Sequence, residues 1–310
     1  MPSRELRGEV HGEAELKADR AAQDAEPLGD DELSARQVHT RQVHKGRGAV
    51  SNLESRFLPI RSVPIADGWA VEPEPALRPG TVLLPDKTVR LITKNRSPDI
   101  PFDRSINPFK GCEHGCVYCF ARPTHAYLDL SPGLDFETRI FFKTGVRKRL
   151  EDELGRRGYQ CQPIAMGTNT DPYQPAEKDL KITRQVLETL LEWRHPVTIV
   201  TKGQLILRDL DLLAELAQLD LVHVSISVTT LSNELKTKLE PRTASPAARL
   251  RVIESLNTAG VPVGAMLAPV IPFVNDQEIE AIVEACAEAG ARKAAYILLR
   301  LPREVGPLFQ

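Results

Sequence analysis

Residues 104–120 read RSINPFKGCEHGCVYCF, a short apolar stretch that runs directly into three closely spaced cysteines. The cysteines are Cys112, Cys116 and Cys119, so their spacing is C-x3-C-x2-C. The chain of 310 residues contains five cysteines, and this loop holds three of them. Such clustering is poor for a disulfide framework and is typical of a metal or cluster site.

Five further apolar runs follow the first, and segments with helical spacing separate them. Continuous β-branched runs, such as LVHVSISV at residues 221–228, are typical of strands buried on both faces. Alternating strands and helices predict an α/β fold with a parallel sheet, and six such units match a partial, TIM-like (βα)6 barrel. The six predicted strands are residues 105–111, 162–168, 196–202, 221–228, 261–267 and 292–300.

This arrangement predicts where ligands bind. Parallel sheets place ligands at the carboxyl ends of their strands, and the cysteine loop follows the first strand. After the second strand, we expect a helix that begins near Pro175 and contains Leu190. Only residues 301–310 follow the last strand, where a sixth helix should begin, so we expect that a carboxy-terminal segment is missing.

Composition divides the chain into three parts. Residues 1–50 contain no Phe, Tyr or Trp and no sustained apolar period, which predicts a disordered tail. Residues 51–100 hold short β-rich pieces between Pro and Gly residues, which predict a small strand-rich lead-in. Residues 101–310 form the predicted barrel.

Charge and hydropathy limit the roles of the whole chain. The formal net charge is -2, so overall basicity does not indicate nucleic-acid binding, and any polyanion site would be local. No apolar run is long enough to span a bilayer, and the amino terminus lacks the apolar region of a secretory signal. We therefore expect a cytoplasmic protein with no membrane partner.

Two kinds of metal site are compatible with the cysteine loop. A structural zinc ion would need a fourth ligand, for which His114 or His125 are candidates; otherwise we expect His114 to be a solvated loop residue. A [4Fe-4S] cluster held by three cysteines keeps one iron without a protein ligand. We favour the cluster, because zinc loops usually contain two C-x2-C pairs and this loop has one. The remaining cysteines, Cys161 and Cys286, do not fit a ligand role.

The cysteine motif, with an aromatic residue before its third cysteine, resembles the signature of radical S-adenosylmethionine (SAM) enzymes. The wider sequence resembles their spore photoproduct lyase-like branch, also described as DNA repair photolyase-like. The similar stretches are KGRGAVSN (45–52), NPFKGCEHGCVYCFAR (107–122), MGTNTDPYQPAEK (166–178), LEPRTASPAARL (239–250) and APVIP (268–272). The resemblance implies a partial (βα)6 barrel, a [4Fe-4S] cluster on Cys112, Cys116 and Cys119, and SAM at the open iron.

The resemblance also implies a reaction. In these enzymes an electron from the reduced cluster cleaves SAM and releases a 5'-deoxyadenosyl radical, which abstracts hydrogen from the substrate. An electron donor such as flavodoxin or ferredoxin, a lyase-type reaction and a nucleic-acid substrate are implied in the same way. Local basic residues offer some support for nucleic acid, but acids interrupt them, so a solvated helix face is the better explanation. They are Arg139, Lys143, Arg147, Lys148, Arg149, Arg156 and Arg157.

Tyr118, Thr168 and Asn169 are the first candidates for SAM contacts. Tyr118 lies between the second and third cysteines and would supply an aromatic surface near the adenine. Thr168 and Asn169 follow the second predicted strand, where the family contacts the SAM amino group, although the common Gly-Gly-Glu pattern is absent here.

Four further candidates lie near the ends of the third and fourth predicted strands. Lys202 resembles a lysine that pairs with the SAM carboxylate in spore photoproduct lyase. Ser225 and Ser227 share a face of the fourth strand, and either hydroxyl could reach the ribose. Arg242 is suited to a carboxylate or a substrate phosphate, or to a surface salt bridge.

Two alternatives to this function stay open. The same radical chemistry would also serve modification of a peptide, a tRNA or a small metabolite. A protein of another class would be a zinc-stabilised binding module without catalysis.

Overall fold

The computed structural model of the chain describes residues 46–49, 52–53, 56–57, 80–97 and 100–310. The predicted disordered tail, residues 1–50, lies outside the described residues except for residues 46–49. Much of the predicted lead-in, including residues 58–79, also lies outside them.

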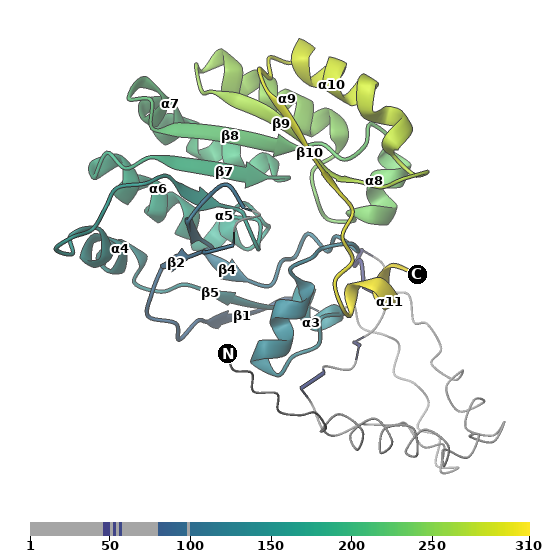
Figure 1. Ribbon diagram of the computed structural model, residues 1–310, viewed down its shortest axis with the longest axis horizontal. Coiled ribbons are helices and arrows are strands. Elements are labelled where there is room, and N and C mark those ends of the chain that lie inside the picture. Colours follow the sequence, from purple (N-terminus) through teal and green to yellow (C-terminus); the bar gives the residue numbers. More distant parts are fainter. Residues whose placement is uncertain (1–45, 50–51, 54–55, 58–79, 98–99) are drawn as a thin grey trace, which may run out of the picture. The chain divides into compact units, whose positions relative to one another are not determined.

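The main sheet has seven strands in the order β10-β9-β8-β7-β6-β3-β2 (Figure 1). All neighbouring strands are parallel except β2 and β3, which pair antiparallel at one edge. The six parallel strands follow the predicted chain order, which confirms the partial (βα)6 barrel. The bounds of all seven strands of this sheet are β2 (Ile92–Lys94), β3 (Arg104–Ile106), β6 (Ile164–Met166), β7 (Val197–Thr201), β8 (Val222–Ser227), β9 (Val263–Val270) and β10 (Ala294–Leu298).

Helices connect the parallel strands, and α7 and α9 pack against β8 (Figure 1). The single helix predicted after Pro175 is wrong, because Lys181, with φ of 50°, separates α5 from α6. None of the helices among the described residues is long and apolar enough to cross a bilayer. The helices are η1 (Arg122–Leu128), α3 (Leu134–Thr138), α4 (Val146–Leu154), α5 (Glu177–Leu180), α6 (Ile182–Glu192), η2 (Gln204–Asp209), α7 (Leu210–Gln218), α8 (Asn233–Leu239), α9 (Pro246–Thr258), η3 (Asp276–Glu278), α10 (Ile279–Glu288) and α11 (Val305–Phe309).

The first predicted strand, residues 105–111, is interrupted. It divides at Pro108, which has no backbone N–H to donate to a strand partner, so β3 and β4 are separate strands. β4 belongs to a second sheet in the order β1-β5-β4, in which β1 is parallel and β4 antiparallel to β5. The chain therefore leaves the main sheet just before the cysteines. The bounds are β1 (Val82–Pro85), β4 (Phe109–Lys110) and β5 (Arg139–Phe142).

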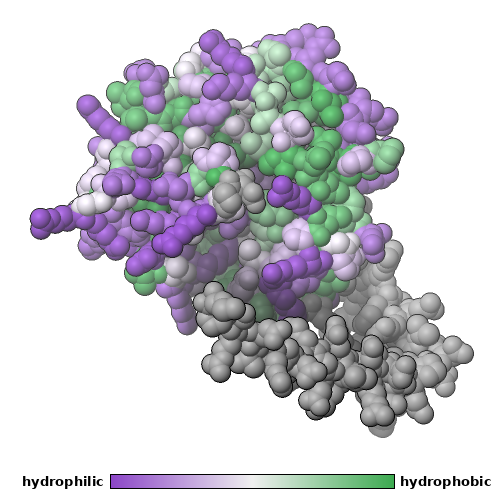
Figure 2. Space-filling model, viewed as in Figure 1, coloured by the Kyte–Doolittle hydropathy of each residue, from purple (hydrophilic) through white to green (hydrophobic). Residues whose placement is uncertain are grey.

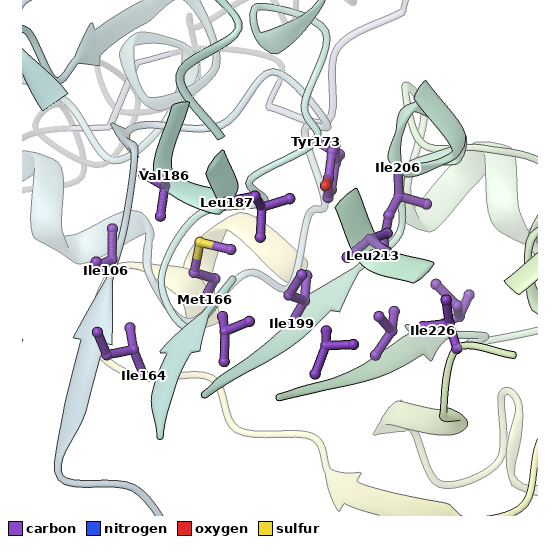
Figure 3. Packing of buried hydrophobic residues seen from close by; sticks show 14 of the residues in the cluster. Ile106, Ile164, Met166, Tyr173, Val186, Leu187, Ile199, Ile206, Leu213 and Ile226 are labelled. Carbon is purple, nitrogen blue, oxygen red and sulfur yellow. The ribbon is translucent and has the colours of Figure 1, made fainter. Parts of the chain in front are cut away.

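The hydrophobic core lies between the main sheet and the helices that cover it. Ile164, Ile199 and Ile226 extend from neighbouring strands toward Leu187 of α6 and Leu213 of α7 (Figure 3). All five side chains are buried. Because such cores pack as densely as organic crystals, they hold the strand ends, and the loops that follow them, in fixed positions.

Strand β10 forms the other edge of the main sheet and is exposed along its whole length. Its exposed side chains include Tyr296, Ile297 and Leu298. Figure 2 shows hydrophobic residues gathered on this part of the surface, over β10 and α10. The chain continues from β10 into the short helix α11.

Gly167, directly after β6, allows a close approach between the ends of β6 and β7. Its φ is +85°, and an added Cβ would overlap the Val200 carbonyl oxygen, whereas Gly158 has φ of +82° and open space around it. We expect Gly158→Ala to lower the free energy of unfolding by about 1 kcal/mol, because of its positive φ alone. Gly167→Ala should lower it by at least about 3 kcal/mol, because backbone overlap adds to that cost. Urea denaturation measures both, and equal losses would contradict the close approach.

Candidate functional site

The cysteine loop begins directly after β4. Cys112 and Cys116 are buried, Cys119 is partly buried, and none of the three forms a disulfide. The Cys112 amide donates a hydrogen bond of 2.9 Å to the carbonyl oxygen of Phe136 in α3. The loop is therefore packed against the rest of the protein and does not extend into solvent.

Arg122 stabilises the end of this loop. Its guanidinium is fully buried, pairs with Glu137 at 2.6 Å and donates to the Cys116 carbonyl oxygen at 2.9 Å. Its remaining contacts are the carbonyl oxygens of Pro132 and Gly133. A buried ion pair is stable when its other polar atoms are also bonded, and this pair meets that condition.

His114 joins the loop to the end of β7. It is only 4% exposed, so the prediction of a solvated loop residue is wrong, and its Nδ1 lies 3.3 Å from the Asp171 carboxylate. Asp171 also accepts hydrogen bonds from the Lys202 amide at 2.8 Å and the Thr201 hydroxyl at 2.6 Å. Burial alone would raise the pKa of Asp171, but His114 and these hydrogen bonds hold that pKa below its ordinary value.

Glu240 is a fully buried carboxylate beside the loop. It pairs with Arg249 and, at 3.1 Å, with Lys202. It also accepts hydrogen bonds from the hydroxyls of Tyr118 and Thr229. Burial would raise the pKa of Glu240, but the two cations and the hydroxyl donors hold it far below its ordinary value. A permanent negative charge is thus fixed next to the cysteines.

Lys202, after β7, brings three of the predicted SAM residues together. Its ammonium donates to the Ser227 hydroxyl at 2.6 Å and to the Ala268 carbonyl oxygen at 3.0 Å. It lies 5.9 Å from the centre of the Tyr118 ring. Ser225 lies on β8 two positions before Ser227, but the described structure gives it no hydrogen bond to this group.

Thr168 and Asn169 follow β6 and are held by a different residue, Asn107. The Asn107 side chain donates to the Thr168 hydroxyl at 3.2 Å and accepts from the Asn169 amide at 3.0 Å. Asn107 and Asn169 line a cavity of about 270 Å³, together with Lys110 and Lys143. Of these two predicted SAM residues, Asn169 therefore borders the cavity and Thr168 does not. Their hydrogen bonds in the described structure go to Asn107 and not to Lys202.

Arg242 lies against the cysteine loop. Its guanidinium pairs with Glu113 at 3.1 Å, and its amide donates to the His114 carbonyl oxygen at 3.2 Å. A third of the side chain is exposed. In this structure Arg242 holds the loop, in a salt bridge at the edge of the site.

Glu240, Arg249 and Glu113 are site residues that the sequence analysis did not single out. Glu113 lies within the cysteine motif, and the other two lie within the similar stretch at residues 239–250. Each is a charged residue within a stretch that resembles the family, and that position was the sequence signal that could have indicated a role at the site. Their burial, however, depends on contacts with distant parts of the chain.

The environment of the thiols suits a group that binds thiolates. Burial raises the pKa of all three thiols. Glu240 adds to the rise at Cys116 and Lys202 opposes it, while Arg122 opposes the rise at Cys119. Because a coordinating metal centre deprotonates thiols, these cations would then stabilise the thiolates. Three buried thiols with cations nearby fit a cluster with three cysteine ligands.

The zinc alternative has less support. Within the described part of the chain, no three His, Cys, Asp or Glu side chains converge on one point where a single ion could bind. His114 is paired with Asp171, and His125 Nε2 lies 3.0 Å from the Arg139 carbonyl oxygen. A cubane cluster binds each cysteine through a different iron, so the sulfurs need not converge on one point.

The basic residues between positions 139 and 157 are mostly paired with acids. On α4, Arg147 pairs with Glu151 and Lys148 with Asp152, each four positions apart. Both pairs are exposed, as expected for a solvated helix face. This region gives no support to a nucleic-acid site.

The fold and the loop define a partial α/β barrel with a cysteine site at the ligand-binding ends of its strands. Residues 106–286, more than half of the chain, match the family model described as "Radical SAM superfamily". The chain belongs to the radical SAM superfamily, as the cysteine motif implied.

Two relatives match the chain over part of their length. An uncharacterized protein of Mycobacterium tuberculosis is 41% identical over 194 residues, which are 62% of this chain and 57% of that protein. An uncharacterized protein of Methanocaldococcus jannaschii is 28% identical over 173 residues, 56% of this chain and 62% of that protein. The chain thus matches less than two thirds of either relative.

A solved structure of spore photoproduct lyase has a similar fold. It is a mutant form of that enzyme with bound AdoMet and dinucleoside spore photoproduct. The TM-score is 0.55 at 15% identity, and the match covers 74% of this chain and 64% of that one. The barrel is therefore of the type found in spore photoproduct lyase.

His125 should make the stability of the protein depend on pH. Burial lowers its pKa from 6.5 to about 4. Between these values the unfolded chain binds a proton that the folded chain excludes, so stability falls by about 3 kcal/mol as the pH drops from 6.5 to 4. Urea unfolding at both pH values should show a smaller loss for His125→Phe than for the wild type. Equal losses would show that another group is responsible.

Proposed function

We propose that the chain is a radical SAM enzyme in which Cys112, Cys116 and Cys119 bind a [4Fe-4S] cluster and SAM binds the remaining iron. The observation that carries this proposal is the set of three buried thiols on one loop, surrounded by residues that follow parallel strands. Membership of the radical SAM superfamily supports it, since the family implies both cofactors.

The bound cluster would supply the electron that cleaves SAM into methionine and a 5'-deoxyadenosyl radical, which takes hydrogen from the substrate. The chain's own residues would bind and orient SAM. Lys202 would pair with the carboxylate, Tyr118 would lie near the adenine, and Ser227 would bond the ribose. The Lys202 ammonium already contacts Ser227, Thr229, Ala268 and Glu240, so SAM would replace at least one of these partners.

The other predicted contacts have weaker structural support. Thr168 and Asn169 are candidates for the SAM amino group, and the cavity that Asn169 lines leaves room for a ligand. Ser225 has no hydrogen bond to the Lys202 group. Arg242 pairs with Glu113 through one guanidinium nitrogen, so a carboxylate or phosphate bound there would share the guanidinium with Glu113.

Nucleic acid is the substrate class that we propose to test first. The similar fold of an enzyme with a bound dinucleoside spore photoproduct supports it. Lys110 and Lys143 lie in the cavity wall, where both pair with Asp86. Affinity for DNA or RNA should then fall steeply with salt, because each neutralised phosphate releases counterions. Binding without salt dependence would favour a peptide or small metabolite instead. A lyase-type reaction and a flavodoxin or ferredoxin donor belong to the same proposal.

The cluster assignment is tested by removing its ligands one at a time. After anaerobic reconstitution, wild-type protein should contain iron and sulfide and should produce 5'-deoxyadenosine when reduced with SAM. Cys112→Ala, Cys116→Ala and Cys119→Ala should each reduce that product to the level found without protein, because the cluster loses a ligand.

Two other cysteines provide matched controls for that experiment. Cys161 is exposed and Cys286 is buried in α10, so Cys161→Ala and Cys286→Ala should keep both iron and activity. A wild-type protein that is colourless and holds one zinc ion would refute the cluster. So would a loop variant that cleaves SAM at the normal rate.

Lys202 is tested by its effect on SAM binding. We expect Lys202→Met to raise the KM for SAM by at least about tenfold, the loss expected for one hydrogen bond to a charged group. Iron content should not change, since Glu240 keeps Arg249 as its partner. The control is Lys238→Met, which removes an exposed lysine from α8. A loss of iron with an unchanged KM would show that Lys202 supports the loop and does not bind SAM.

A further inference from the structure

Residues 46–49 lie directly against the cysteine loop, although more than 60 positions separate them from it in the sequence. Gly48 is the point of closest approach. A Cβ on Gly48 would overlap the carbonyl oxygen of Gly115, the residue before Cys116. Gly48 does not have a positive φ, so its lack of a side chain reflects this approach and not an unusual backbone conformation.

Glu137 holds this segment in place. One carboxylate oxygen accepts a hydrogen bond from the Gly48 amide at 3.0 Å, and the other accepts one from the Ala49 amide at 2.7 Å. Glu137 is also the buried partner of Arg122, which donates to the Cys116 carbonyl oxygen. A single carboxylate therefore connects residues 48 and 49 with the backbone of the cysteine loop.

A second chain of contacts runs from the same segment to the start of the loop. The Arg47 guanidinium donates to the Glu137 carbonyl oxygen at 2.8 Å and to the Thr81 hydroxyl at 3.0 Å. That hydroxyl donates to the Glu113 carboxylate at 2.6 Å, which also accepts from Arg242. Glu113 directly follows Cys112. The segment is thus connected to the neighbours of two of the three cysteines.

We propose that residues 46–49, with Glu137, Arg122 and Thr81, position the cysteine loop for its cluster and limit access of solvent to the thiols. This inference rests on the proposed function. It concerns the loop and not the barrel, because the segment approaches Gly115 directly, reaches Glu113 through Thr81, and takes no part in the main hydrophobic core. These side chains are positioning residues, since they act through the loop.

The five cysteines of the chain permit a direct test in the protein without cluster. Gly48→Ala adds a Cβ that prevents residues 46–49 from packing against Gly115 of the cysteine loop, while the Arg122–Glu137 pair stays intact. The control is Gly80→Ala, where no atom lies within 4 Å of the added Cβ and φ is not positive. Alkylation by iodoacetamide, followed by mass spectrometry, gives a separate rate for each cysteine.

Two cysteines outside the loop serve as internal references. Cys161 is exposed and reports the intrinsic rate, while Cys286 is 1% exposed in the core and reports global unfolding. In Gly48→Ala we expect the loop cysteines to react at least about tenfold faster, the change for losing one hydrogen bond to a charged group. In the same variant, Cys161 and Cys286 should react at their wild-type rates. In Gly80→Ala, all five cysteines should react at their wild-type rates.

If Gly48→Ala also exposes Cys286, a milder variant distinguishes a local change at the loop from unfolding of the whole protein. Thr81→Val removes only the hydroxyl between Arg47 and Glu113, and should speed alkylation of Cys112 about threefold or more, as expected for a weaker contact. Wild-type rates at the loop cysteines in both variants would overturn the proposal. The proposal would also be overturned if, in both variants, the alkylation rate of Cys286 increased by the same factor as the rates of the loop cysteines.

The reconstituted protein gives an independent readout. The visible absorbance of the cluster should decay faster in air for Gly48→Ala than for Gly80→Ala, at equal initial iron content. An equal decay would contradict the shielding role. If the wild type binds no cluster at all, the proposed function fails, and the alkylation rates still decide whether the segment positions the loop.

Discussion

The buried ion pair between Arg122 and Glu137 is the contact on which the candidate site depends most. Removing two charges from water is costly, so such a pair persists only where every remaining polar atom is bonded. Arg122 meets this condition through carbonyl oxygens in and after the cysteine loop, and Glu137 through the amides of Gly48 and Ala49. Three separate segments must therefore be in place together, which makes the shape of the loop a cooperative property of the fold.

Glu240 has a corresponding role beside Tyr118, between the second and third cysteines of the loop. It is fully buried, and its partners come from the cysteine loop, from the residues just after β7 and β8, and from α9. Glu240 contacts both Lys202 and the Tyr118 hydroxyl, and the Lys202 ammonium lies 5.9 Å from the centre of the Tyr118 ring. Two buried carboxylates, each paired with at least one cation, thus hold the cysteine loop, and its backbone has little freedom to rearrange.

The parts of this structure that the sequence predicts are those determined by local pattern. Six short apolar runs separated by segments with helical spacing located the six parallel strands, and spacing located the cysteine loop. The interruption at Pro108 could also have been predicted, because proline cannot donate within a sheet. The burial of His114 and the role of Glu240 could not, since they depend on partners far away in the chain: Tyr118 and Glu240 are 122 positions apart. No propensity or periodicity records a contact over that distance.

The carboxyl-end edge of the sheet has two regions with different physical character. At β7 and β8, the polar groups around Lys202 and Glu240 already have partners, so a ligand must exchange contacts to bind there. At β3 and β6, a cavity bordered by Asn169 offers space instead. The cysteine loop joins the two regions. Lys110, just before the loop, lines the cavity, and Tyr118, within the loop, contacts Glu240. The two regions thus adjoin the two ends of one short segment, residues 110–118, which includes Cys112 and Cys116, so any shift of this segment would change the surroundings of both regions together.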